Sequence, residues 1–400
     1  MRIKKRIFDK MNPKQANLSA LQFIFWATFA AYYPFTVVFL QAKGFNNTTI
    51  GTILSINSFI VIFAQPFWGM VSDRLRSVKK VFLFCMIVAA LIIQFFPFIS
   101  SVIGMTLLLA TLTMFESPLS PLMDSWVIQE IRNEQDLSFG NIRLWGSLGY
   151  SLFAYILGIL VDRASMRYNF IIFAIMTAIV ILLTRNIKDE ATASTISLKD
   201  MKISKLLKNY SYITFLLFSI VIYIPHKASY SFLPNLLIAV GGSPGSQGIA
   251  SAVMAFSEIP LFLASHKLLK RYKPIHLILA SAVFFLLRQV TYLTATTPEQ
   301  VIWAQVFHGP SFALFLNGAV YYIDSLAPDE LKSTAQTLAT SLYGGVSGIL
   351  ANYGGGWVID NLGIRKLYSI GIWAIIIVTL FFVGSLLLYN KIKNPNSKSI

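Results

Sequence analysis

Charged side chains are scarce in this 400-residue sequence. Asp, Glu, Lys and Arg make up 12% of the residues, whereas a soluble domain has roughly a quarter. Apolar residues make up 56% and come in runs of about twenty, the length of a membrane-spanning helix. The composition therefore excludes an ordinary soluble protein and predicts an all-α polytopic membrane protein.

Residues that bind metals or form disulfides are equally few. The one cysteine, Cys85, lies inside an apolar run, which excludes a disulfide framework and a cysteine metal site. The four histidines lie on different segments without the spacing of a zinc site. No catalytic triad, metal motif or phosphate-binding motif is evident, so we expect no cofactor, no metal and no enzyme activity. The basic N-terminus lacks the apolar core of a cleaved signal peptide.

The basic residues are informative about topology. The net charge of +16 could suggest a nucleic-acid-binding protein, but the basic residues sit in short clusters between apolar runs, which argues against nucleic acid.

Twelve spans are predicted, at 18–41, 49–70, 80–99, 102–128, 140–161, 168–185, 209–239, 247–265, 275–295, 300–325, 333–358 and 366–389. With the N-terminus inside, the loops and tails on the cytoplasmic side hold 25 of the 33 Lys and Arg. This bias predicts a multi-pass protein of the plasma membrane with both termini cytoplasmic.

The longest hydrophilic stretch divides these spans into six and six. We expect a cytoplasmic arm at 1–17, an N-terminal six-helix bundle at 18–185, a linker at 186–208, a C-terminal six-helix bundle at 209–389 and a tail at 390–400. PLMDSW at 121–126 is similar to YYIDSL at 321–326, and RLWGSLGYSL at 143–152 to SLYGGVSGIL at 341–350. Both matches are offset by about 200 residues and predict two pseudo-repeats. Chance similarity between apolar segments is the alternative.

The loop after the second span carries a recognisable motif. GMVSDRLRSVKK at 69–80 resembles the loop motif of the major facilitator superfamily, with Gly69, Asp73, Arg74 and Arg76 as its gating residues. Arg76 stands one place earlier than in the family motif. The resemblance implies the twelve-helix major facilitator fold, in which Gly69 permits close helix approach.

Further motifs suggest a branch of that superfamily. SPLSPLMD at 117–124, followed by FGNIRLWGSLG at 139–149, resembles the phenylpropionate permease group, which is allied to lactose permease and nucleoside:proton symporters. HKASYSFLPNLL at 226–237 and QVFHGPSFALFLNGAVYYI at 305–323 extend the resemblance into the second half. It implies a proton-linked carrier of sugars, nucleosides or aromatic acids. Lys227 departs from the pattern, since a small residue is expected there, and leaves the charge of the solute open.

Ionisable residues inside the spans are the candidate site. Charges at membrane depth are costly and usually face a partner or a watery cavity. A symporter needs a carboxylate whose proton affinity depends on its partner, and we assign this role to Asp124 and Glu258, with His308 as a possible relay. Asp124 could instead only anchor its helix end, Glu258 could satisfy backbone freed by Pro260, and His308 could be structural.

Cations and aromatics complete the predicted site. Arginine suits a carboxylate or vicinal hydroxyls because its planar fork donates two parallel hydrogen bonds. The candidate solute-binding residues are Arg143, Trp145, Tyr150, His226, Tyr230, Arg288 and Asn317. Arg143 could instead only neutralise Asp124, and most aromatics at span ends form interface belts. Trp145 and Tyr150 flank Arg143 and resemble the solute-stacking position of lactose permease.

The sequence therefore favours proton-coupled uptake of a small organic solute by alternating access. The expected partners are the solute, a proton and the lipid bilayer, and nothing demands more than a monomer. A drug or metabolite efflux antiporter is the alternative, although the fifth span lacks the Gly-Pro signature expected of that branch. A membrane-embedded enzyme or sensor is a more remote alternative.

Overall fold

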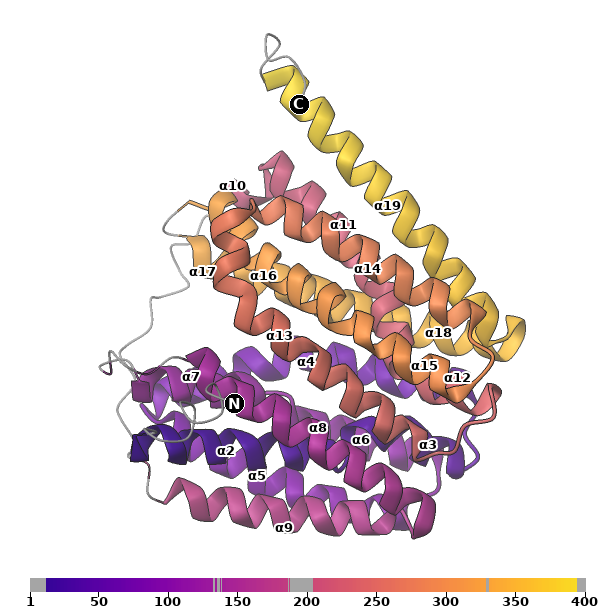
Figure 1. The fold of residues 1–400 in the computed structure, drawn as a ribbon. Helices are drawn as coiled ribbons and strands as arrows, with labels where there is room; N and C mark the ends of the chain where they lie inside the picture. The colour runs from indigo at the N-terminus through magenta and orange to yellow at the C-terminus, as the bar shows by residue number, and fades with distance from the viewer. Residues whose placement is uncertain are drawn as a thin grey trace, which may run out of the picture. The chain divides into compact units, whose positions relative to one another are not determined.

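The structure is a computed structural model that describes residues 12–131, 134, 137, 139–185, 187, 204–328 and 331–393. The predicted arm and linker, and the end of the tail, lie mostly outside these residues. All regular elements among the described residues are helices (Figure 1). In the first half these are α2 (Pro13–Ala30), η1 (Tyr33–Phe35), α3 (Thr36–Ala42), α4 (Asn47–Arg74), α5 (Val78–Ile92), η2 (Ile93–Phe98), α6 (Val102–Glu116), α7 (Leu119–Ile131), α8 (Phe139–Arg163) and α9 (Arg167–Thr184).

The second half repeats this pattern of long helices and short breaks. Its elements are α10 (Ser204–Leu207), α11 (Tyr210–Ser231), α12 (Leu233–Ala239), α13 (Ser246–Arg271), α14 (Pro274–Thr294), α15 (Pro298–Ala304), η4 (Gln305–Phe307), α16 (His308–Leu326), α17 (Lys332–Ser341), the π-helix η6 (Leu342–Val346), α18 (Ser347–Leu362) and α19 (Ile364–Lys393).

Helix ends follow local sequence signals. Asn12 caps α2 by accepting from the backbone N–H of Lys14, with Pro13 at the first helical position, so this helix begins five residues before the predicted span. Ser77 caps α5 in the same way. Gly44 and Gly241 adopt left-handed φ angles of 85° and 90° after α3 and α12, a conformation that glycine tolerates without strain.

Ten helices of the described chain are long and apolar enough to cross a membrane. They match ten of the twelve predicted spans. The other two, at 300–325 and 333–358, are interrupted: a 3-10 turn separates α15 from α16, and the π-helix η6 separates α17 from α18. Gly344 and Gly345 lie in that π-helix, a kind of irregularity frequent at functional sites.

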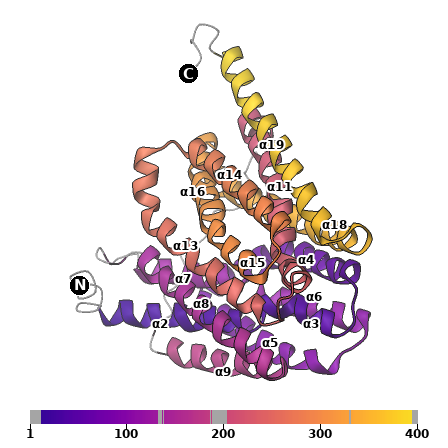
Figure 2. The same cartoon turned by 45° about the vertical axis from the view of Figure 1, so that its right-hand side comes forward.

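The chain divides into two compact units. Unit 1 contains 1–43, 60–196 and 243–259, and unit 2 contains 44–59, 197–242 and 260–400. In unit 1, α2 packs along α8 and α9 around a core that includes Phe25, Phe82 and Trp126 (Figure 1). In unit 2, α14 packs along α16 and α19, and α11 along α18 and α19 (Figure 2). The predicted division into two six-helix bundles stays a prediction.

Large apolar side chains are exposed along many of these helices. Ile103 is 76% exposed, Phe63 59% and Leu380 68%. Patches of this kind are rare on soluble monomers and are what lipid covers in a membrane protein.

Candidate functional site

The first charged cluster lies in unit 1 and joins α2, α7 and α8. Arg143 Nε lies 3.7 Å from Asp124 Oδ1. The amide of Gln22 donates to the same oxygen at 3.5 Å, and the Trp26 indole N–H donates to the Gln22 carbonyl oxygen at 3.0 Å. The side chains of Arg143 and Asp124 are 30% and 33% exposed. The contact is longer than that of a tight bidentate pair, and both side chains are partly exposed. It can therefore be broken without leaving a fully buried charge.

Trp26 and Gly146 shape the surroundings of Arg143. The guanidinium carbon lies 4.2 Å from the centroid of the Trp26 ring, a cation–π contact. A Cβ at Gly146 would overlap with the Trp26 ring, so glycine is required for this approach. Arg143 also interacts electrostatically with Glu258 of α13, which belongs to the same unit. Asp124 is thus in contact with Arg143, and Glu258 lies within electrostatic range of the same guanidinium.

The second cluster lies in unit 2 and centres on Arg288 of α14, which is 1% exposed. Its Nε donates to the Tyr292 hydroxyl at 2.6 Å. Its Nη1 lies 3.2 Å from His226 Nδ1 and 3.0 Å from His308 Nδ1, and its Nη2 donates to Gln305 Oε1 at 3.5 Å. Tyr292 in turn donates to Gln305 at 3.0 Å. Helices α11, α14 and α16 and the turn η4 thus bring one cation and four neutral polar groups together.

Aromatic rings hold the two histidines in place. The Phe312 ring stacks on both imidazoles, at centroid distances of 5.8 Å for His226 and 5.4 Å for His308. Phe285 and Tyr223 meet His226 edge-on, each at 5.2 Å. Since the rings are packed on several sides, the histidine orientations are set by the core of unit 2.

Four further residues were predicted to bind the solute. Tyr150 packs against Trp26 with ring centroids 6.5 Å apart. Trp145 follows on α8 and is partly buried, as is Tyr230 on α11. Asn317 donates to the carbonyl of Ala313 in its own helix at 2.8 Å and does not join the Arg288 cluster.

The gating motif is more helical than expected. α4 continues through Gly69, Asp73 and Arg74, and only Arg76 adopts a left-handed φ of 49°. No atom of the described residues lies within 4 Å of a Cβ built at Gly69. The close helix approach expected there is therefore not observed.

Four residues of the two clusters were not among the predicted site residues: Gln22, Trp26, Tyr292 and Gln305. Tyr292 and Gln305 carried a signal, since Tyr292 follows Arg288 by one helical turn and Gln305 precedes His308 by three positions. Gln22 lies between apolar residues of the first span and is fully buried. A buried glutamine is unusual, and a polar residue within an apolar span was the signal that could have identified it.

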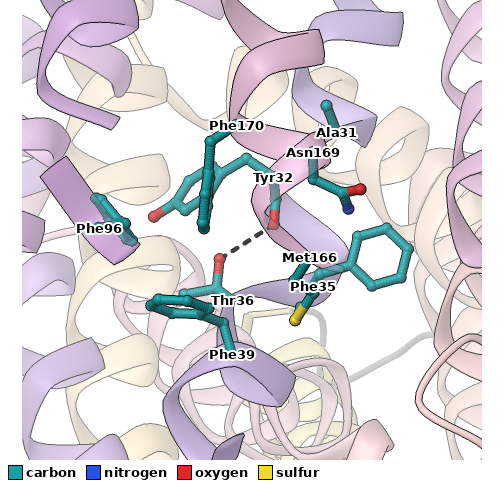
Figure 3. A pocket seen from close by; sticks show the side chains of 9 residues that line it. All are labelled: Ala31, Tyr32, Phe35, Thr36, Phe39, Phe96, Met166, Asn169 and Phe170. Carbon is teal, nitrogen blue, oxygen red and sulfur yellow. Dashed lines mark hydrogen bonds between the residues drawn. The ribbon is translucent and has the colours of Figure 1, made fainter. Parts of the chain in front are cut away.

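A small cavity in unit 1 is too narrow for a solute. Its volume is about 10 Å³, room for about one water molecule. Figure 3 shows Asn169 among its lining side chains, together with Tyr32, Phe96 and Phe170. The Asn169 amide is buried and forms no hydrogen bond with the described residues. The cavity therefore fits a bound water rather than a solute.

Two carboxylates bind the starts of two long helices. In unit 2, Asp360 at the end of α18 accepts from the backbone N–H groups of Asn47 and Thr48 at 3.2 and 2.6 Å, and from their side chains at 2.8 and 2.7 Å. A Cβ at Gly356 would overlap with the Asn47 carbonyl oxygen, and one at Gly51 with the backbone of α18. We call this contact of α18 with the start of α4 the Asp360 seal.

Unit 1 contains an equivalent contact. Asp162 at the end of α8 accepts from the Ser243 hydroxyl at 2.6 Å and from the Gly245 N–H at 2.7 Å, at the start of α13. Gly158 and Gly248 touch backbone to backbone. Each residue of this Asp162 seal has its counterpart in the Asp360 seal about 200 residues away, the offset of the predicted repeat. The seals are therefore structural evidence for the repeat that the sequence suggested only weakly.

The model of the MFS_1 like family matches residues 15–370. The chain belongs to this family. Its maltose permease relative from Geobacillus stearothermophilus is 26% identical over 86% of this chain and 88% of the relative. The probable 3-phenylpropionic acid transporter of Escherichia coli is 22% identical over 83% and 88%. The crystal structure of the nucleoside transporter NupG matches with a TM-score of 0.81 at 17% identity, over 94% of this chain and 99% of that one, and shows the fold.

The family assignment confirms several predictions. The predicted major facilitator fold is confirmed, and so is the expectation that this protein is a membrane transporter rather than an enzyme.

Proposed function

We propose that this transporter takes up a small organic solute, a sugar, nucleoside or aromatic acid, together with a proton by alternating access. The Asp124–Arg143 contact carries the proposal. Its 3.7 Å separation, its partial exposure and the nearby Glu258 make a carboxylate whose partner can change. Protonation of Asp124 would release Arg143, so that proton binding and a change in the site are linked.

The two seals support the alternating-access part of the proposal. By the predicted topology the Asp162 and Asp360 seals both lie on the outer side of the membrane. Each is made of a few hydrogen bonds and glycine contacts rather than a large apolar core, which suits a contact that must open and close. We further propose that the protein is a monomer of the plasma membrane with both termini cytoplasmic.

The printed activities of the relatives support the range of solutes. They include a maltose permease, a putative nucleoside transporter and a probable 3-phenylpropionic acid transporter. Within this range the Asp124–Arg143 contact favours solutes with polar groups, because the partly exposed Arg143 offers hydrogen-bond donors.

Proton flux tests the proposal directly. The purified protein is placed in liposomes with an internal pH dye, and sugars, nucleosides and aromatic acids are added outside. Symport of the right class carries protons inward, so the dye should report a more acidic liposome interior when that class is added. Asp124→Asn or Glu258→Gln should abolish uphill accumulation and leave solute exchange measurable, whereas Glu299→Gln, an exposed acid outside the predicted spans, should behave as wild type. Normal accumulation by both variants would refute the coupling assignment.

A further inference from the structure

Four side chains of unit 1 form a closed ring of contacts around the Asp124–Arg143 pair. The Trp26 indole N–H donates to Gln22 Oε1 at 3.0 Å, and Gln22 Nε2 donates to Asp124 Oδ1 at 3.5 Å. The same Asp124 oxygen lies 3.7 Å from Arg143 Nε, and the Arg143 guanidinium carbon lies 4.2 Å from the centroid of the Trp26 ring. Trp26 therefore contacts the acid side of the pair through Gln22 and the basic side with its ring face.

Trp26 fixes the direction in which the Gln22 amide points. The two residues lie four positions apart on α2, so their side chains share one face of the helix. An indole N–H can only donate, so the Gln22 oxygen must face Trp26 and the Gln22 NH₂ group must face Asp124. Gln22 is fully buried, and a reversed amide would place two donors against each other, which is costly in a buried place. The amide is therefore held as a donor to the Asp124 carboxylate.

A fixed donor distinguishes the two protonation states of Asp124. A hydrogen bond to an ionised carboxylate is stronger than one to a neutral acid, so a donor at this place favours the ionised form. The ionised form is also the one that attracts Arg143. A protonated Asp124 could donate to the amide oxygen only if the Gln22 amide turned over and lost its bond with Trp26. The Gln22–Trp26 pair therefore opposes protonation of Asp124.

The charged groups around Asp124 come from two other helices of unit 1. Arg143 of α8 faces it directly, and Glu258 of α13 lies within electrostatic range of Arg143. Lysines near the starts of α2 and α5 form separate contacts: Lys14 with Glu130 and Glu134, and Lys79 with the Trp126 ring and the Ile187 carbonyl oxygen. Gln22 thus acts on a carboxylate whose direct charged partner is Arg143.

We propose that Gln22 is a positioning residue that sets the pH at which Asp124 takes up its proton, and that Trp26 acts through Gln22 by holding the amide in its donating orientation. Neither residue carries the proton. The inference rests on the proposed function, in which Asp124 is a coupling carboxylate, and deepens it by naming the residues that regulate that carboxylate.

Infrared difference spectroscopy measures the protonation of Asp124 without requiring transport. The full-length protein in lipid nanodiscs is titrated between about pH 4 and 9. The signal is the C=O band of a protonated carboxyl group that is absent from the Asp124→Asn variant. Gln22→Met keeps the length of the side chain and removes both hydrogen-bonding groups. We expect it to move the midpoint of this band upward by about 0.5 to 1 pH unit, a gain in proton affinity of about three- to tenfold.

A second variant tests the role of the indole. Trp26→Phe removes the N–H and keeps an aromatic ring for Arg143, so the Gln22 amide becomes free to turn over. The midpoint of the Asp124 band should move in the same direction as in Gln22→Met. The double variant should shift no further than Gln22→Met alone, because Trp26 acts through Gln22. Either single variant is a sufficient test of the Gln22 contact if the other does not fold.

The same substitutions elsewhere in unit 1 are matched controls. Gln94 donates to two backbone carbonyl oxygens, and the Trp68 N–H donates to one. Gln94→Met and Trp68→Phe therefore remove the same groups away from the ring of contacts around Asp124. Both should leave the midpoint of the Asp124 band as in wild type.

The outcomes separate this inference from the proposed function. An unchanged midpoint in folded Gln22→Met or Trp26→Phe, or an Asp124 band that does not titrate, would overturn the inference, and proton-coupled uptake would then still support the proposed function. Additive shifts in the double variant would show that Trp26 does not act through Gln22. Shifted midpoints without any proton movement during uptake would support the inference and refute proton coupling.

Discussion

Asp360→Asn perturbs the Asp360 seal, a contact that the proposed transport cycle opens and closes, with little change in side-chain size. In the Asp360 seal, Oδ1 accepts from both groups of Asn47, and Oδ2 accepts from both groups of Thr48. Asparagine has a single acceptor oxygen. Its NH₂ group would face donors at one of these two residues, so one half of the seal is lost and the negative charge at the start of α4 disappears.

The size of the effect follows from helix capping. Loss of an N-terminal cap costs about 0.5–2 kcal/mol, and a charge at a helix N-terminus contributes about 0.3–1 kcal/mol. Asp360 is exposed, so solvent screening reduces the charge contribution. A net loss of about 1 kcal/mol shifts the closed-to-open equilibrium about fivefold. The variant should therefore populate the outward-open state several times more than wild type.

Pulsed electron spin resonance can measure that population. Nitroxides at Thr52 of α4 and Tyr353 of α18, exposed residues that line one groove, report the separation of the two helices. The buried cysteine is first removed as Cys85→Ala. We expect the long-distance fraction to grow about fivefold in Asp360→Asn. Identical distance distributions in the variant and wild type, at equal protein stability, would show that the seal does not control opening.

Three further predictions concern the same contacts. Asp162→Asn should open the transporter by a similar factor, and the double variant with Asp360→Asn should show the product of the two effects, measured by the same label pair. Gly356→Ala should hold the outer side open, because its Cβ overlaps with the Asn47 carbonyl oxygen, whereas Gly354→Ala, which meets nothing within 4 Å, should behave as wild type in uptake. Burial raises the pKa of Asp360, but hydrogen bonds from Thr48 and Asn47 outweigh it and leave the pKa below the ordinary value of 3.8. The ionised carboxylate of Asp360 therefore stabilises the seal at pH values above 3.8. This stabilisation is lost only as the pH falls through the lowered pKa. The distance distribution should therefore not change between about pH 7 and 5.

The sequence predicted the fold because two strong signals agreed. Apolar runs of about twenty residues gave the spans, and the loop motif at Asp73 gave the superfamily. The ends of the spans were predicted less well. The first helix begins earlier than the predicted span because Asn12 caps it. The π-helix around Gly344 interrupts a span that hydropathy predicted as one continuous helix. Hydropathy averages over a window and does not detect a local change of helix type.

The candidate site could be predicted in part. Ionisable residues in an apolar span stand out one by one, so Asp124, Arg143 and Arg288 were found. Their partners could not be paired from the sequence. Arg288 was predicted as a solute-binding residue, but its neighbours Tyr292, His226 and His308 could not be assigned to it, because the pairing depends on which faces of α11, α14 and α16 meet. Polar residues such as Gln22 and Gln305 are common on solvated loops, so their role inside a span requires the packed structure.

The seals connect the repeat in the sequence to the proposed transport cycle. Each pairs the end of a long helix from one half of the chain with the start of a helix from the other half: α18 with α4, and α8 with α13. Both contacts combine an aspartate with a close backbone contact of a glycine. Under the proposed alternating access, with both contacts on the outer side as the predicted topology has them, opening breaks both, and a mutation in either should bias the same equilibrium. This is why two residues far apart in sequence, Asp162 and Asp360, are expected to act on one conformational change.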